Sequence, residues 1–206
     1  MSRKQISANE VFTPRSHDVN STMYINRPEH ERALRRAITS GYNVVVFGDS
    51  GCGKSWLYKK VFSDDKVYYH SIDFSGASTS DDVDLKLLEA VAEFQEWREA
   101  ERTETGSMQV KPFRTGAGYE ESNLIKKNDT TPLFQLLDLI RHTAGHARAF
   151  LVLENLEYIL DQSEVIKRIQ LMLLAVDDPM FGKLGVQICL VGVPSEIKEI
   201  LSDGNR

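Results

Sequence analysis

The stretch "VVVFGDSGCGKSWLYKK", residues 44–60, constrains the fold of this 206-residue chain more than any other feature. Residues 44–47 form an apolar run of the length expected for a buried parallel strand. A glycine-spaced turn follows, and residues 54–62 then return to the apolar spacing of a helix. The pattern G-x-x-x-x-G-K-[ST] is matched by Gly48, Gly53, Lys54 and Ser55. Because this motif lies between a predicted strand and a predicted helix, the sequence predicts a phosphate-binding loop.

The residue types in this loop suit the chemistry of phosphate. A loop that binds crowded negative charge must present several backbone N–H groups without intervening side chains, which Gly48, Gly51 and Gly53 permit. Lys54 can reach the β- and γ-phosphates of a nucleotide, and the Ser55 hydroxyl can bind a Mg²⁺ ion that bridges them. The residues expected to bind the nucleotide here are Gly48, Asp49, Ser50, Gly51, Cys52, Gly53, Lys54, Ser55 and Trp56. The predicted ligands are ATP and Mg²⁺, and adenine is favoured over guanine because the chain has no N-K-x-D string.

The rest of the chain alternates predicted strands with predicted helices. Further strands are expected at residues 66–74, 149–153 with Glu154 at the end, and 186–191. Helices are expected at residues 28–40, from residue 80, from Pro132 behind a Thr131 cap, and at 163–176. This alternation predicts an α/β fold with helices on both faces of a parallel sheet, and the phosphate-binding loop makes this the three-layer sandwich of the P-loop NTPase type.

We divide the chain into a polar N-terminal segment, residues 1–22, and one nucleotide-binding domain, residues 23–206. Within that domain, residues 102–128 lose apolar periodicity over a length too great for an ordinary connection. We therefore expect them to form a mobile insertion.

Composition bounds the cellular setting and the partners. Neither an apolar leader nor a run of about 18 apolar residues is present, so the sequence predicts a cytoplasmic protein with no membrane partner. Cys52 and Cys189 are too few for a disulfide framework or a metal site, and we expect reduced thiols. The net charge of −5 does not indicate a nucleic-acid-binding protein. Binding of nucleic acid through a local basic patch is still compatible with this charge.

The second chemical motif is the acidic end of the strand in "AFLVLENLEYI". Parallel strands point their C-terminal ends at one crevice, so Glu154 is expected close to the phosphate-binding loop. Proteins with this loop usually carry an Asp for the metal and then a Glu for the water, where this chain has Glu154 and Asn155. Either Glu154 serves the metal and hydrolysis is slow, or Glu154 polarises water while Ser55 and the phosphates hold the metal. The candidate catalytic residues are thus Lys54, Glu154 and Asn155, and the candidate metal ligands are Ser55 and Glu154.

These motifs together resemble AAA+ ATPases of the P-loop class, nearest the origin-initiator and STAND-like bacterial branch. The likeness covers residues 23–201 and lies in "MYINRPEHERAL", "GDSGCGKS", "FLVLEN" and "ICLVGVPSEI". It implies that Tyr24, Ile25 and Arg27 lie near the base and ribose. The residues alone fit equally well a hydrophobic staple of Tyr24 and Ile25 before a helix. The usual polar sensor residue would fall near Gly192 or Val193, whose side chains cannot form hydrogen bonds, and Ser195 is a poor substitute.

The resemblance also implies parts that would follow residue 206, namely a fifth core strand, a helical lid and an arginine finger. We therefore expect the chain to be truncated before them and to act with a neighbouring copy or a C-terminal effector domain.

The function expected is Mg²⁺-dependent ATP binding and hydrolysis, as a switch or motor module of a larger ATPase. The alternative is a nucleotide-binding scaffold with little or no turnover that controls a DNA or protein partner. A small-molecule kinase is less favoured because nothing after Glu154 indicates a lid or a substrate pocket. Bacterial defence and mobile-element biology are the settings favoured by the branch.

Overall fold

The computed structural model describes residues 19–20, 23–104, 131–156 and 162–192, with side chains described outside residues 95–104. Its single sheet has four parallel strands in the spatial order β1-β4-β3-β2. The strands are β1 (Val44–Phe47), β2 (Tyr68–Asp73), β3 (Ala149–Glu154) and β4 (Val186–Gly192). All four strands were predicted from the sequence.

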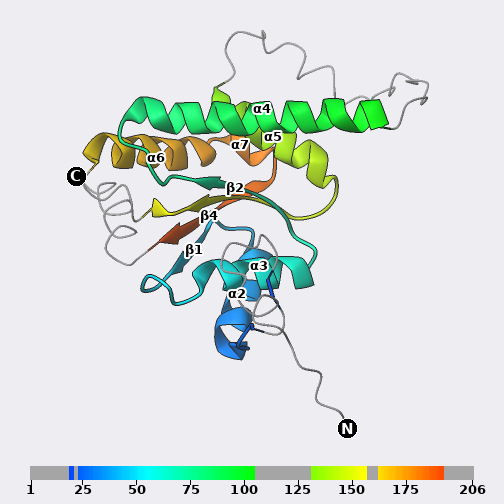
Figure 1. Cartoon of the computed structure of the whole chain (residues 1–206), viewed down its shortest axis with the longest axis vertical. Helices are drawn as coiled ribbons and strands as arrows, with labels where there is room; N and C mark the ends of the chain where they lie inside the picture. Colours follow the sequence, from blue (N-terminus) through cyan, green and yellow to red (C-terminus); the bar gives the residue numbers. More distant parts are fainter. Residues whose placement is uncertain (1–18, 21–22, 105–130, 157–161, 193–206) are drawn as a thin grey trace.

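The helices divide between the two faces of this sheet (Figure 1). One face carries α2 (Pro28–Ser40) and α3 (Lys54–Asp64). The other carries α4 (Ser80–Glu104), α5 (Pro132–Ala144), α6 (Ser163–Val176) and α7 (Pro179–Gly182). The predicted three-layer α/β sandwich is therefore confirmed. None of the described helices is both long and apolar enough to span a membrane.

The central strand β3 shows why helices must cover both faces. Phe150 and Val152 point into the core beneath α2 and α3, whereas Leu151 and Leu153 point into the larger core beneath α4, α5 and α6. All four side chains are completely buried. Burial of successive residues on opposite faces is typical of a parallel strand between two helical layers.

The start of β2 and the end of α4 differ from the prediction. The strand expected at residues 66–74 begins only at Tyr68, because Lys66 has a positive φ of 54° and the Val67 amide donates to the Phe62 carbonyl at the end of α3. Helix α4 continues to Glu104, so residues 102–104 of the expected insertion are helical. The remainder of that insertion, and most of the N-terminal polar segment, lie outside the described residues.

Local capping explains two helix starts. The Thr131 side chain accepts a hydrogen bond from the Phe134 amide at 3.3 Å, which confirms the predicted cap of α5. The four-residue α7 was not predicted; Asp178 caps it by accepting the Met180 amide at 2.8 Å. A helix of a single turn is too short to show apolar periodicity, so only its cap marks it in the sequence.

Candidate active site

The loop between β1 and α3 has the conformation that its glycines allow. Gly51 and Gly53 adopt left-handed φ angles of 75° and 84°, which side chains disfavour. A Cβ atom on Gly48 would lie 2.9 Å from the Cys52 Sγ, closer than real Cβ atoms come. The tip of the loop, residues 49–52, is exposed. The glycines thus let the backbone turn sharply, and the tip of the loop is open to an approaching ligand.

Lys54 is the first residue of α3 and folds back over the loop. Its side chain is buried, although it is charged. The ammonium Nζ donates hydrogen bonds to the carbonyls of Gly48 at 2.9 Å and Asp49 at 3.0 Å. An ammonium has three N–H donors, so one remains for an incoming acceptor such as a phosphate oxygen.

Ser55 and Glu154, the two predicted metal ligands, lie together. The Ser55 hydroxyl donates to the Glu154 Oε1 at 2.8 Å, although the two residues are far apart in the sequence. A hydroxyl and a carboxylate are hard oxygen ligands, the type that Mg²⁺ prefers, and Mg²⁺ usually keeps several waters and substrate phosphates in its shell. The described residues contain no group of three or more His, Cys, Asp or Glu that could hold a metal. This donor set fits a Mg²⁺ ion shared with phosphates and does not fit an all-protein metal cage.

Beneath Glu154 the core supplies neutral groups. Burial, with the Glu154 charge as a further cause, raises the pKa of Tyr58 far above its usual value. Burial and Glu154 likewise raise the pKa of the Cys189 thiol. The buried Tyr58 hydroxyl has no hydrogen bond of ordinary geometry with the described residues, although Glu154 lies close enough to act on it. The core groups next to Glu154, the Tyr58 hydroxyl and the Cys189 thiol, are therefore uncharged at neutral pH. The structure has Cys52 and Cys189 as free thiols, as predicted.

The segment before α2 is held against that helix by Glu31. Glu31 Oε1 accepts hydrogen bonds from the Tyr24 hydroxyl at 2.9 Å and from the Arg27 amide at 3.0 Å. Partial burial, together with Glu31, raises the pKa of Tyr24 to about 12. The Arg27 guanidinium lies over Gly53, where an added Cβ would be 2.7 Å from Nη2. Arg27 is thus placed beside the loop, and Tyr24 lies against α2 and near Lys60 of α3.

Ile25 behaves differently from its two neighbours. Its side chain is 76% exposed, so it does not form the hydrophobic staple that was the alternative prediction. Its predicted place near the base stays a prediction.

Asp73 is a residue at this edge that the sequence analysis missed. It ends β2 directly opposite Glu154, and its Oδ1 accepts the Ser75 amide at 2.7 Å. Partial burial acts to raise the pKa of Asp73, but hydrogen bonding from Asn155 and Ser75, together with Lys86, holds it below the usual value. Asn155 itself has a left-handed φ of 57°. An acid at the end of the strand "KVYYHSIDF" was the available signal, but the pairing of this strand with β3 was not known.

The predicted sensor position carries no polar side chain in the part of the chain that the structure describes. Gly192 ends β4, and its carbonyl accepts the Gly48 amide at 3.3 Å. The backbone of β4 therefore supports the start of the loop. Val193 and Ser195 lie outside the described residues.

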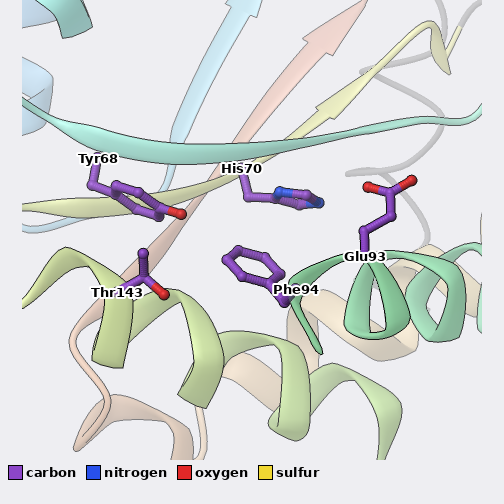
Figure 2. A pocket seen from close by; sticks show the side chains of 5 residues that line it. All are labelled: Tyr68, His70, Glu93, Phe94 and Thr143. Atoms are coloured by element: carbon purple, nitrogen blue, oxygen red, sulfur yellow. The ribbon is translucent and has the colours of Figure 1, made fainter. Parts of the chain in front are cut away.

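A cavity of about 300 Å³ lies away from this edge, between β2 and helices α4 and α5 (Figure 2). Tyr68 and His70 line it from β2, Glu93 and Phe94 from α4, and Thr143 from α5. The His70 and Phe94 rings lie 4.7 Å apart, and burial lowers the pKa of His70 despite the nearby Glu93 charge. None of the residues that line this cavity belongs to the loop.

Comparisons with known proteins agree with this geometry. Residues 35–201 match the AAA domain family. A Walker-type ATPase of Pyrococcus abyssi has a similar solved structure, with a TM-score of 0.55, 14% sequence identity and 91% of this chain covered. This chain spans 51% of the length of that structure. The search of curated proteins gave no significant match. Since the family match covers well over half of the chain, the protein belongs to the AAA domain family of P-loop nucleotide-binding proteins.

Proposed function

We propose that the chain binds ATP with Mg²⁺ at the loop of residues 48–55 and hydrolyses it, as the switch or motor module of a larger ATPase. The observation that carries this proposal is the hydrogen bond between Ser55 and Glu154, 2.8 Å long, beside the buried Lys54. It brings a hydroxyl, a carboxylate and a cation to one edge of the sheet, directly behind a glycine loop. Charge of both signs in that position suits a metal-bound polyphosphate.

Each residue has a separate task in this proposal. The backbone N–H groups of the loop and the start of α3 bind the phosphates, and Lys54 contributes its remaining N–H donor. Ser55 and Glu154 are the residues that would hold Mg²⁺, whose charge would offset the negative charge of the β- and γ-phosphates. The 2.8 Å contact favours the first of the two predicted roles of Glu154, on the metal side. Arg27 lies beside the loop and would contact the nucleotide there, and Tyr24, three residues earlier and held by Glu31, would contact it from the same segment.

The scaffold with little turnover is a second candidate, because a specific observation favours it. Asn155 stands where a second carboxylate would be expected, and the end of β4 carries glycine in place of a polar sensor. In both candidates, a neighbouring copy that supplies an arginine would raise the rate of ATP hydrolysis, because such arginines accelerate phosphoryl transfer about 10³-fold or more in related enzymes. We propose such a neighbour or an attached effector domain as partner.

Phosphate release from MgATP over hours separates the two candidates. Wild-type protein is expected to release phosphate slowly, below the roughly 1–100 s⁻¹ of kinases, and excess EDTA is expected to stop the release because the metal is removed. Lys54→Ala protein, purified in the same way, controls for contaminating enzymes. Phosphate release no faster than that control, from a protein that still binds MgATP, would support the scaffold.

A further inference from the structure

A second carboxylate lies beside Glu154 without a task in the proposed function. Asp73 is the last residue of β2 and pairs with Glu154 in the register of β2 and β3. The Phe74 amide donates to the Glu154 carbonyl at 3.0 Å, so the two strands remain paired up to this edge. Residues directly opposite in paired strands point to the same face of the sheet. Asp73 and Glu154 therefore both point to the face that carries α3.

At this edge of the sheet, the Asp73 side chain has acceptor sites left for a water molecule. Glu154 is engaged by the Ser55 hydroxyl at 2.8 Å. Asn155 follows it with an amide side chain, which cannot accept a proton as a carboxylate does. Asp73 is exposed, and its Oδ1 accepts a hydrogen bond from the Ser75 amide at 2.7 Å. A carboxylate has about four lone-pair sites, so Asp73 retains acceptors for a water molecule.

Asn155 is placed to hold this carboxylate. Its left-handed φ of 57° is unusual for a residue other than glycine, although Asn tolerates that region better than most. Asn155 directly follows Glu154, the register partner of Asp73, and hydrogen bonding from its side chain is one of the causes that hold the pKa of Asp73 below its usual value. The end of β3 thus carries an amide where a carboxylate for the water is usual, and the neighbouring end of β2 carries a carboxylate.

We propose that Asp73 is the catalytic carboxylate that orients the attacking water, and that Asn155 is a positioning residue for Asp73. The inference rests on the proposed ATP hydrolysis. In that step the water oxygen forms a bond to the γ-phosphorus while the bond from that phosphorus to the β–γ bridging oxygen breaks. The bridging oxygen leaves on ADP with the electron pair, and one water proton passes through the Asp73 carboxylate to the phosphate product. No further reactant is needed.

Asp73→Asn tests this role in the full chain. The amide keeps an oxygen for the Ser75 N–H, so the turn after β2 is preserved, but it can no longer accept the proton. We expect turnover of MgATP to fall roughly 10²-fold or more, while the rise in melting temperature caused by MgATP stays as in wild type. Asp81→Asn, which makes the same change at the exposed start of α4, is the matched control and should keep wild-type turnover.

An exchange variant tests the pairing with Asn155. Asp73→Asn/Asn155→Asp moves the carboxylate to β3, and Asp tolerates the left-handed φ at that position. We expect it to recover part of the turnover lost in Asp73→Asn, which a purely structural role for Asp73 would not produce. Asp73→Asn turnover within about threefold of wild type would overturn the inference, as would a loss of MgATP stabilisation in that variant. Wild-type protein without turnover would overturn the proposed hydrolysis itself, a result visible before any variant is compared.

Discussion

Lys54→Ala is expected to abolish the stabilisation that MgATP gives the wild-type protein. A ligand that binds only the native state adds RT ln(1 + [L]/Kd) to the free energy of unfolding, about 2.7 kcal/mol at a hundredfold excess over Kd. The Lys54 ammonium is the cation that closes over the loop, through the carbonyls of Gly48 and Asp49. Its removal takes away both the charge and the donor for the phosphates. Thermal unfolding with and without saturating MgATP measures the effect.

Lys59→Ala is the matched control for this prediction. Lys59 lies on the same helix, but its ammonium lies 5.9 Å from the centre of the Tyr58 ring and makes no contact with the loop. Lys59→Ala should therefore keep the full MgATP shift. A shift of wild-type size in Lys54→Ala would show that the nucleotide binds elsewhere, for instance in the cavity beside His70.

Glu154→Gln is expected to lower phosphate release by roughly 10²-fold or more while nucleotide binding persists. Glutamine preserves the size of the side chain and an oxygen that can accept from Ser55, but it removes the negative charge that would hold Mg²⁺. ATP binding through the loop backbone and Lys54 does not need that charge. Measurements of phosphate release and of the MgATP thermal shift on one preparation separate the two effects.

Glu164→Gln supplies the control for charge, because Glu164 is exposed in the first turn of α6 and contacts no loop residue. Wild-type phosphate release by Glu154→Gln would remove Glu154 from the chemistry. It would leave Asp73 as the carboxylate to examine at this edge.

The sequence predicted the layers and most elements because their signals are local. The apolar run before Gly48 marks β1, and the spacing of Leu136, Leu137 and Ile140 marks a helix whose buried face those residues form. The glycines and Lys54 identify the loop because their pattern is contiguous in the chain. The contact between Ser55 and Glu154 agrees with the expected position of Glu154 close to the loop, because β1 and β3 point their C-terminal ends at the same edge of the sheet.

The features that the sequence could not indicate are the position of Asp73 beside Glu154 and the contacts of Tyr24 and Arg27. They depend on strand register and on hydrogen bonds between side chains. Asp73 meets Glu154 only because β2 pairs with β3 in one particular register, and no local pattern encodes that register. Tyr24 and Arg27 form hydrogen bonds to Glu31 in place of the apolar staple that was one of the two alternatives, because the Glu31 carboxylate offers acceptors to both residues. Periodicity cannot distinguish these two modes of contact, since both place Tyr24 beside α2.

Equilibrium competition between nucleotides tests the central claim most directly. Wild-type protein would bind a fluorescent ATP analogue in the presence of Mg²⁺, and unlabelled ATP, ADP, AMP and adenosine would each be added as competitors. If the loop and Lys54 bind the β- and γ-phosphates, ATP and ADP should displace the analogue at concentrations at least roughly 10²-fold lower than AMP or adenosine. Displacement by AMP or adenosine as effective as displacement by ATP, or no saturable binding by folded protein, would contradict the account.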